Sequence, residues 1–324
     1  MKKIRWGIVG PGSIANRFAK AVQNVDCAEL VAVASREESR AQAFAEKHGI
    51  PNVFCGYEAM AASNLVDAVY VATPHSFHKP CAELFLKAGK HVLCEKPVCV
   101  NADEARALKE CAEANGVFLM EAMWTRFLPA ILEAQEIVKR GDIGEIIGIE
   151  ADFCYPSTPN STSRLYRSEL AGGALLDVGV YCLHFASLFL GNAPESITAV
   201  AHTNGVVDLH TTALLKYKNG AIANLSTAIS VAKPETAYIY GTKGQIYLPC
   251  FYGAQELFVT VGKNTEHIVK NYLGNGFEEE IIECCQCIAA GKQQSDTLPT
   301  EESIIMMQQM DLIRQQIGIR YTCE

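Results

Sequence analysis

The feature that most constrains this chain is a glycine-rich turn close to its start. An apolar run over Ile4–Val9 leads into Gly-Pro-Gly-Ser-Ile-Ala at residues 10–15, and an amphipathic stretch follows over Ile14–Gln23. Gly10 permits a tight turn, and Gly12 lets a pyrophosphate approach the backbone. Strand, turn and helix in this order predict the first unit of a dinucleotide-binding fold; the alternative is a glycine-rich turn that holds no ligand.

The helix that follows this turn is predicted to hold the phosphates of the dinucleotide at its N-terminus. Its first amide groups, at Ser13 and Ile14, have no partner within the helix, and together with the helix dipole they favour negative charge. Ala15 is small enough to let the helix pack closely on the sheet. A dinucleotide is therefore the first ligand that we expect.

Short apolar runs and amphipathic stretches alternate over the rest of the first 123 residues. Strands are expected at 29–34, 53–54, 68–72, 91–94 and 117–121, and helices at 37–48, 57–62, 79–88 and 102–115. Because this alternation with short loops is typical of βαβ units, we predict an α/β Rossmann domain with a parallel sheet and helices on both faces.

The pattern changes after Met123, where we place a boundary between a Rossmann domain over 1–123 and a substrate-binding and dimerisation domain over 124–324. Strands are expected at 146–154, 197–202, 211–217, 221–228, 237–240 and 245–248, and helices at 129–139, 174–190, 277–290 and 301–316. Asn219-Gly220 between two of these strands is a strong hairpin signal. The second domain is predicted to be α+β, with an open, mostly antiparallel sheet.

Charge and composition argue against several classes of partner. The chain has 324 residues, of which 49% are hydrophobic, and its net charge is -8. A protein that binds nucleic acid would present a basic face, and the acidic balance gives no support for docking on an anionic membrane. We see no run of 18 apolar residues that would span a membrane. The 13 cysteines are scattered and odd in number, which predicts reduced thiols in a cytoplasmic protein.

The end of the second strand bears on which dinucleotide is bound. NAD-dependent enzymes usually place an acid there to bind the ribose 2′-hydroxyl, whereas this strand ends in Ser35 and Arg36. Ser35 can donate to a phosphate, and Arg36 can form a bidentate pair with one. We therefore expect NADP rather than NAD. In the alternative, Arg36 is a solvated surface residue and Glu37 takes the role of the acid.

A loop with two histidines follows the fourth strand, at the edge of a parallel sheet where ligands bind. Its sequence is Thr73-Pro74-His75-Ser76-Phe77-His78. No third metal ligand lies nearby, so we expect no metal there. The loop is predicted to shape the cofactor pocket near the nicotinamide.

The next strand ends in Glu95-Lys96-Pro97 at the same edge. A lysine there can orient the nicotinamide ribose and lower the pKa of a neighbouring acid or alcohol. The Lys96-Pro97 bond can be cis. The alternative is a surface turn without a catalytic role.

A second constellation lies in the run Gly-Gly-Ala-Leu-Leu-Asp-Val-Gly-Val-Tyr at residues 172–181. Asp177 and Tyr181 are four residues apart and share one face of an otherwise apolar helix. A buried acid is costly without a partner or a function, and tyrosine suits proton transfer to or from an alcohol oxygen if a nearby cation, such as Lys96, lowers its pKa. The alternative is a core tyrosine that hydrogen-bonds Asp177.

Together these motifs resemble the Gfo/Idh/MocA oxidoreductase family, and the resemblance extends over nearly the whole chain. It rests on the turn at 10–15, the Glu95-Lys96-Pro97 triplet and the run at 172–181. Residues 121–127 and 173–181 look most like the dimeric dihydrodiol dehydrogenase and NADP-dependent D-xylose dehydrogenase branch. Many family members carry histidine where this chain has Tyr181, and those often act on inositols or other polyols.

The resemblance implies roles for particular residues. Lys96 would be the active-site lysine, Tyr181 the general acid/base, and Asp177 would position the substrate or tune Tyr181. Trp124 and Arg126 would join Asp177 and Tyr181 in contacting the substrate. The cofactor would be held by a set that includes Arg36 at the 2′-phosphate; its other members are Gly10, Gly12, Ser13, Ile14, Ser35, Thr73, Pro74, His75, His78, Glu95 and Lys96.

The expected function is reversible hydride transfer between NADP and a carbinol carbon of a sugar or a cyclic vicinal diol, without a metal. Tyr181 takes the hydroxyl proton and Lys96 stabilises the oxyanion. By the resemblance, a homodimer covers the open sheet. Two alternatives stay open: a non-catalytic NADP-binding sugar sensor, which would be expected to lose Lys96, Asp177 and Tyr181, and a sugar oxidoreductase with non-dissociating NADP, which would purify with its cofactor bound.

Overall fold

A computed structural model describes residues 3–159 and 163–324, which form two compact units. The first unit comprises Met1–Trp124 and Leu273–Ile304, and the second comprises Thr125–Tyr272 and Ile305–Glu324. The sequence division placed all of 124–324 in the second domain, whereas the chain contributes residues 273–304 to the first unit. The reason is packing: the helix within that segment, α8 (Phe277–Ala289), packs on α1 (Ser13–Val22).

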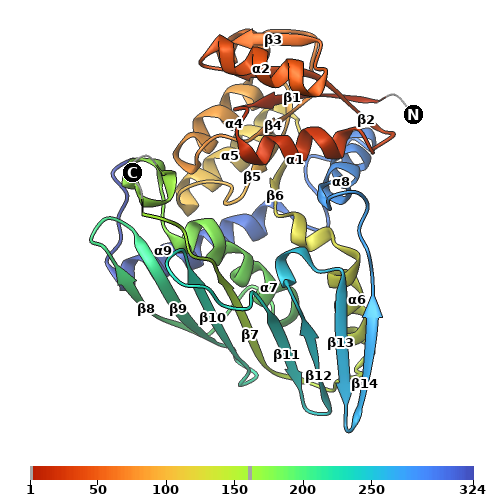
Figure 1. Cartoon of the computed structure of the whole chain (residues 1–324), viewed down its shortest axis with the longest axis vertical. Helices are drawn as coiled ribbons and strands as arrows, with labels where there is room; N and C mark the ends of the chain where they lie inside the picture. The colour runs from red at the N-terminus through yellow and green to blue at the C-terminus, as the bar shows by residue number, and fades with distance from the viewer. Residues whose placement is uncertain (1–2, 160–162) are drawn as a thin grey trace. The chain divides into compact units, whose positions relative to one another are not determined.

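The first unit is built on a six-stranded parallel sheet with the strand order β3-β2-β1-β4-β5-β6 (Figure 1). Its strands are β1 (Ile4–Val9), β2 (Ala28–Ser35), β3 (Asn52–Cys55), β4 (Ala68–Val71), β5 (His91–Glu95) and β6 (Leu119–Ala122). Its other helices are α2 (Glu38–His48), α3 (Tyr57–Ala61), α4 (His78–Lys87) and α5 (Ala102–Asn115). The strand order reverses between β1 and β4, and in such sheets ligands bind outside the carboxyl ends of the strands at this point.

The second unit is built on an eight-stranded sheet with the order β14-β13-β12-β11-β7-β10-β9-β8. Its strands are β7 (Ile146–Cys154), β8 (Ser196–Thr203), β9 (Asp208–Lys216), β10 (Ile222–Ala228), β11 (Ala237–Gly241), β12 (Gly244–Leu248), β13 (Glu256–Val261) and β14 (Asn264–Val269). Strands β7 and β10 run parallel, and the other neighbouring pairs are antiparallel. The predicted fold class is therefore confirmed for both halves of the chain.

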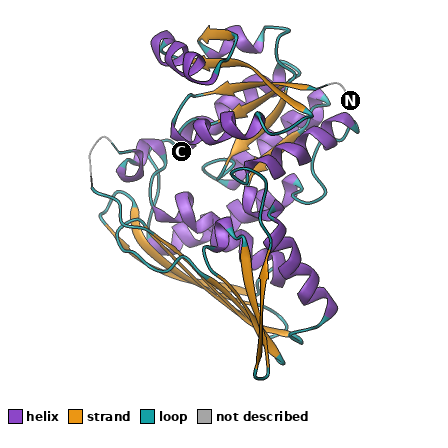
Figure 2. Ribbon diagram, turned by 45° about the vertical axis from the view of Figure 1, so that its right-hand side comes forward, coloured by secondary structure: helices purple, strands orange, loops and turns teal. Residues whose placement is uncertain are grey.

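Helices pack on this sheet as Figure 2 shows in purple. A π-helical turn at Leu175–Gly179 continues into α7 (Val180–Leu190), which packs on β7 and β10, and α6 (Pro129–Arg140) packs on α7 and β13. The last helix, α9 (Thr300–Ile317), begins within the segment of the first unit and ends in the second. The helix that carries Asp177 and Tyr181 thus lies directly against the sheet.

Within the described residues, one helical run is long and apolar enough to cross a membrane by length and composition. This run, Ser168–Leu190, contains the helix just described, and 83% of its most apolar window is buried inside the fold. The sequence analysis expected no stretch that would span a membrane and did not single out this run. A run this deeply buried is typical of the core helix of a folded domain.

The expected elements agree closely with the observed ones, with one omission. Helix 102–115 and strand 146–154 begin and end as predicted, and Asn219-Gly220 joins the antiparallel strands β9 and β10. The hairpin of β13 and β14 was not predicted. Its second strand, Asn-Thr-Glu-His-Ile-Val, is largely exposed and lacks the apolar alternation that marks a strand.

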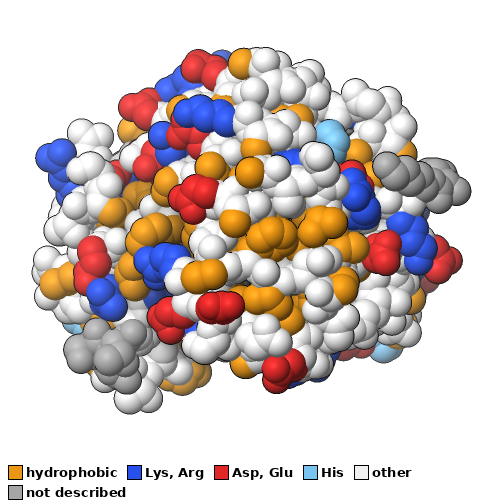
Figure 3. Space-filling model, turned by 90° about the horizontal axis from the view of Figure 1, so that it is seen from above, with side chains coloured by type: hydrophobic (Ala, Val, Ile, Leu, Met, Phe, Trp, Pro, Cys, Tyr) orange, Lys and Arg blue, Asp and Glu red, His pale blue; other side chains and the backbone are white. Residues whose placement is uncertain are grey.

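The sheet of the second unit exposes apolar side chains from several strands. Ile147, Val200, Leu214 and Ile222 are 56%, 69%, 47% and 49% exposed. Tyr238 stacks on both Tyr240 and Tyr247, and Phe258 stacks on His267. On the face of the molecule drawn in Figure 3, hydrophobic side chains lie among interspersed basic and acidic ones.

Candidate active site

The glycine-rich turn between β1 and α1 has the backbone geometry that a phosphate site needs. Gly10 has a φ of +86°, and a Cβ there would come within 3.1 Å of Thr73 Cγ2. Gly12 is the N-cap of α1, and no described side chain caps that end of the helix. A Cβ at Gly12 would meet its nearest neighbour, Ala72 O, only at 3.9 Å. The turn therefore leaves backbone amides and space for a phosphate, which fits a dinucleotide.

The residues at the end of β2 sit where the adenine-side ribose of a dinucleotide is bound in this kind of fold. Ser35 is buried, and its Oγ accepts a hydrogen bond of 3.3 Å from the Glu37 amide. The exposed Arg36 places its Cζ 5.1 Å from the ring centroid of Phe77, a cation–π contact. This contact keeps the guanidinium at the tip of β2.

His78 ties two of the predicted cofactor segments together. Its Nδ1 lies 2.7 Å from Pro97 O and its Nε2 lies 2.8 Å from Thr73 O, so both ring nitrogens contact backbone carbonyls. The His75 and His78 rings meet edge to face at 5.6 Å, and both side chains are buried. His78 thus holds the loop after β4 to the turn after β5.

The Glu95-Lys96-Pro97 turn is anchored through its first residue. Glu95 is 6% exposed. Its Oε1 accepts a hydrogen bond from the Tyr70 hydroxyl, and its Oε2 accepts one of 3.1 Å from the Lys96 amide. The Tyr70 ring stacks on Phe18 at a centroid distance of 4.0 Å. The Lys96-Pro97 peptide bond is cis, and the half-buried Lys96 side chain starts at the carboxyl edge of the parallel sheet.

In the second unit, Asp177 is held by two residues that the sequence did not assign to it. Asp177 lies in the π-helical turn and is 4% exposed. Its Oδ1 accepts a hydrogen bond of 2.7 Å from Arg164 Nη2, and its Oδ2 accepts one of 2.7 Å from the Tyr155 hydroxyl. Burial, and then the charge of Asp177, raises the pKa of Tyr155. Tyr155 is therefore a tyrosine that hydrogen-bonds Asp177.

Tyr181 lies on α7, one turn beyond Asp177, in an aromatic environment. Its side chain is 7% exposed, and its ring lies 5.3 Å from that of Phe153 and 6.0 Å from that of Tyr252. Aromatic rings therefore contact the Tyr181 ring on two sides. Tyr181 and Asp177 both belong to the second unit, whereas Lys96 belongs to the first.

Trp124 and Arg126, which were also predicted to contact substrate, likewise belong to different units. Trp124 ends the first segment of the first unit, and the guanidinium of Arg17 lies 4.7 Å from its ring centroid. Arg126 belongs to the second unit, is 5% exposed, and has its Nη1 3.4 Å from His184 Nδ1. Arg164 and Tyr155 were missed because they are 13 and 22 residues from Asp177 in the chain. A signal that could have indicated Arg164 is its place in a polar loop just before Gly172.

Two family models match this chain. Residues 4–123 match the description "Oxidoreductase family, NAD-binding Rossmann fold", and residues 131–247 match "GFO/IDH/MocA C-terminal domain". The chain belongs to the Gfo/Idh/MocA oxidoreductase family. The resemblance inferred from the motifs is thereby confirmed.

Relatives that align with this chain over 98% of both lengths indicate the class of reaction. The chain is 37% identical to a trans-1,2-dihydrobenzene-1,2-diol dehydrogenase of Mus musculus over 98% of both chains, and 36% identical to that of Homo sapiens over the same shares. A solved 3-ketoreductase from Actinomadura kijaniata, in complex with NADP and TDP-benzene, matches with a TM-score of 0.89 at 30% identity over 98% of both chains. An aldose-aldose oxidoreductase from Caulobacter crescentus matches with a TM-score of 0.90 at 25% identity and the same coverage. This member of the family is an oxidoreductase that acts on CH–OH groups.

Proposed function

We propose that this protein is an NADP-dependent dehydrogenase for a carbinol group of a sugar or of a cyclic vicinal diol. The observation that carries the proposal is the site around Asp177. A buried carboxylate, held by Arg164 and Tyr155, lies one helical turn before a buried tyrosine hydroxyl. Such a pair suits the binding of a vicinal hydroxyl and the transfer of its proton. Relatives named for a diol and for sugars support this substrate class.

In the proposed mechanism each side chain has one task. The nicotinamide, when bound, exchanges a hydride with the carbinol carbon. Tyr181 accepts the hydroxyl proton during oxidation and returns it during reduction, and the Lys96 ammonium stabilises the negative charge that develops on the oxygen. Asp177 accepts a hydrogen bond from a second substrate hydroxyl. The mechanism requires Lys96 and Tyr181 to reach the same substrate oxygen.

The preference for NADP rests on the tip of β2. Arg36 offers a fork that matches a 2′-phosphate, and its contact with Phe77 limits the side-chain freedom that is lost on binding. Glu37 is the competing group, because a carboxylate there would favour the 2′-hydroxyl of NAD. The similar 3-ketoreductase, whose structure contains NADP, supports NADP over NAD.

We further propose that the protein is a cytoplasmic homodimer without nucleic-acid or membrane partners. The exposed apolar residues and stacked aromatic rings of the second unit's sheet are a surface that a second copy would cover. All 13 cysteines are free thiols, which suits a reducing compartment. Fractionation of cells that express the protein tests the location.

The deciding experiment measures NADPH and NADH formation by absorbance with aldoses, inositols and cyclic diols. We expect turnover with NADP on one aldose or diol. Tyr181→Phe should lower kcat by about 10²–10⁴-fold, the usual contribution of a positioned acid/base. Turnover with NAD alone would refute the cofactor assignment. No turnover, with NADP retained through purification, would instead favour a sugar oxidoreductase with non-dissociating NADP.

A further inference from the structure

Two glycines at the start of the Asp177 helix allow unusually close packing. A Cβ at Gly172 would lie 2.5 Å from the carbonyl oxygens of Arg164 and Leu165. Gly173 has a φ of +104°, and a Cβ there would overlap Oδ1 of Asp208. The start of the helix therefore packs directly against the loop that carries Arg164 and against the carboxylate of Asp208.

Asp208 caps this helix from the neighbouring sheet. It is the first residue of β9, and its side chain is fully buried. Its Oδ2 accepts hydrogen bonds of 2.8 Å from the Leu175 amide and of 2.8 Å from the Thr211 hydroxyl. A carboxylate on the first amides of a helix satisfies groups that the helix cannot pair itself, and it complements the helix dipole. Burial raises the pKa of Asp208, and these hydrogen bonds oppose that rise.

A second contact fixes the same end of the helix. The Thr227 hydroxyl, on β10, donates a hydrogen bond of 3.0 Å to Ala174 O. Thr227 and Thr211 are direct partners in the pairing of β9 with β10. Adjacent strands thus hold the amide of Leu175 and the carbonyl of Ala174, which lie two and three residues before Asp177.

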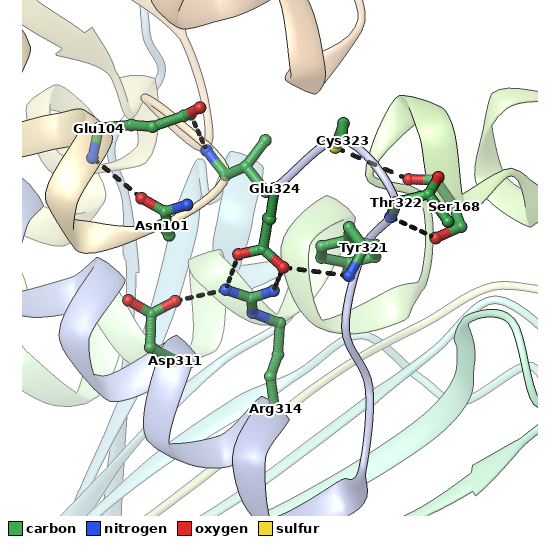
Figure 4. A network of polar contacts seen from close by, with 10 residues as sticks. Asn101, Glu104, Ser168, Asp311, Arg314, Tyr321, Thr322, Cys323 and Glu324 are labelled. Atoms are coloured by element: carbon green, nitrogen blue, oxygen red, sulfur yellow. Dashed lines mark hydrogen bonds and ion pairs between the residues drawn. The ribbon is translucent and has the colours of Figure 1, made fainter.

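Residues near the C-terminus of the chain support this arrangement, as Figure 4 shows. The Thr322 amide donates a hydrogen bond of 3.0 Å to Ser168 Oγ, in the short loop between Arg164 and Gly172. Arg314 pairs with Glu324 and lies 5.0 Å over the Tyr321 ring. Burial, and then the charge of Asp208, raises the pKa of Tyr321. The C-terminal residues therefore contact the loop before Gly172, and Tyr321 lies close enough to Asp208 to feel its charge.

We propose that Asp208 is a positioning residue for the reaction: by holding the first turn of the helix against β9, it sets where Asp177 and Tyr181 meet the substrate. The inference rests on the proposed function of those two residues. Asp208 contacts neither substrate nor cofactor in this proposal. Its effect comes through the Leu175 amide, two residues before Asp177.

The test compares Asp208→Ala and Asp208→Asn with Ser295→Ala as a matched control. Ser295 is also fully buried and accepts hydrogen bonds from two backbone amides, those of Thr297 and Leu298, but it belongs to no proposed site. We expect Asp208→Ala to lower kcat by about 10–100-fold, because a misplacement of about 1 Å costs up to about 100-fold. Its KM for NADP should stay unchanged. Asparagine keeps an oxygen for the Leu175 amide, so it should restore kcat to within about fivefold of wild type, the remaining loss coming from the weaker acceptor.

Ser295→Ala should lower the Tm without changing kcat. Equal loss of Tm in Asp208→Ala and Ser295→Ala, with kcat unchanged in both, would overturn the proposal. If Asp208→Ala does not fold, Thr211→Val removes one hydrogen bond from the same oxygen, and the proposal then requires a fall in kcat of about two- to fivefold.

Hydrogen exchange separates this inference from the proposed function. In Asp208→Asn and Thr211→Val, amide exchange should accelerate in peptides covering 172–181 and stay unchanged in α5. That result in a protein with no turnover on any substrate would keep the positioning role while refuting the function. Turnover in the wild type, with uniform exchange in all variants, would refute the positioning role alone.

Discussion

Glu95 in the first unit and Asp177 in the second are both buried carboxylates that accept a hydrogen bond from a tyrosine hydroxyl. The tyrosine for Glu95 comes from the adjacent parallel strand, and Lys96 follows directly in the chain. The partners of Asp177 come from the segment just after β7 and from a loop, and Gly172 lets the chain pack closely against the loop that carries Arg164. A sheet edge thus assembles its site from strand ends, whereas the second site depends on long-range packing.

Replacing the two carboxylates gives the largest expected difference between the units. Asp177→Asn should lower kcat/KM for the carbinol substrate by about 100-fold or more, because it removes the charged partner of Arg164 and weakens the acceptor for the substrate hydroxyl. Glu95→Gln should act through the cofactor-side turn and raise the KM for NADP. Steady-state kinetics with each substrate varied checks both. The comparison fails if Asp177→Asn raises the KM for NADP and leaves kcat/KM for the carbinol substrate unchanged.

The two units should respond differently to a charge that replaces an exposed leucine. Leu214→Glu, on the open sheet of the second unit, should shift the protein from dimer to monomer in analytical ultracentrifugation, since a desolvated carboxylate at an interface costs several kcal/mol. The control change Leu65→Glu, at a residue that lies in the loop between α3 and β4 of the first unit and is 41% exposed, should leave the sedimentation coefficient unchanged. A wild-type protein that sediments as a monomer would contradict the proposed dimer.

Removing the hydroxyl of Tyr70 or of Tyr155 compares the hydrogen bonds to the two carboxylates, with smaller expected effects. Tyr70→Phe and Tyr155→Phe each remove a hydrogen bond to a carboxylate, so each should lower the free energy of unfolding by roughly 1–3 kcal/mol. The Phe18 stack is kept in Tyr70→Phe. We expect only Tyr155→Phe to raise the KM for the carbinol. Urea denaturation and kinetics on the same samples give both quantities, and an equal change in carbinol KM for the two variants would count against separate roles.

The smallest expected effect concerns Glu280, another buried carboxyl, on α8 of the first unit. Both of its oxygens lack a hydrogen-bond donor among the described residues. Burial, and then the charge of Glu95, raises its pKa well above the usual range. As the pH rises above about 4.3, the unfolded chain releases this proton while the folded protein keeps it, so stability falls with rising pH.

Glu280→Gln removes this dependence. The Tm of the variant minus the Tm of wild type should therefore be larger at pH 8 than at pH 5. Thermal unfolding followed by circular dichroism at the two pH values measures the difference. Glu279→Gln, beside it on the same helix, is the control and should show no such trend. A parallel pH dependence in Glu280→Gln and wild type would contradict a neutral Glu280.

The sequence by itself determined the features that depend on neighbours in the chain. The turn at Gly10–Ala15, the strand–helix alternation and the four-residue spacing of Asp177 and Tyr181 are local patterns, and local backbone preferences express them directly. Only the tertiary structure decided that residues 273–304 complete the first unit, that β14 pairs with β13, and that Tyr155, Arg164 and Asp208 surround the Asp177 helix. The contacts that Arg164, Tyr155 and Asp208 make with this helix span 13, 22 and 33 residues of sequence, and a linear pattern carries no signal for which distant groups packing will bring together.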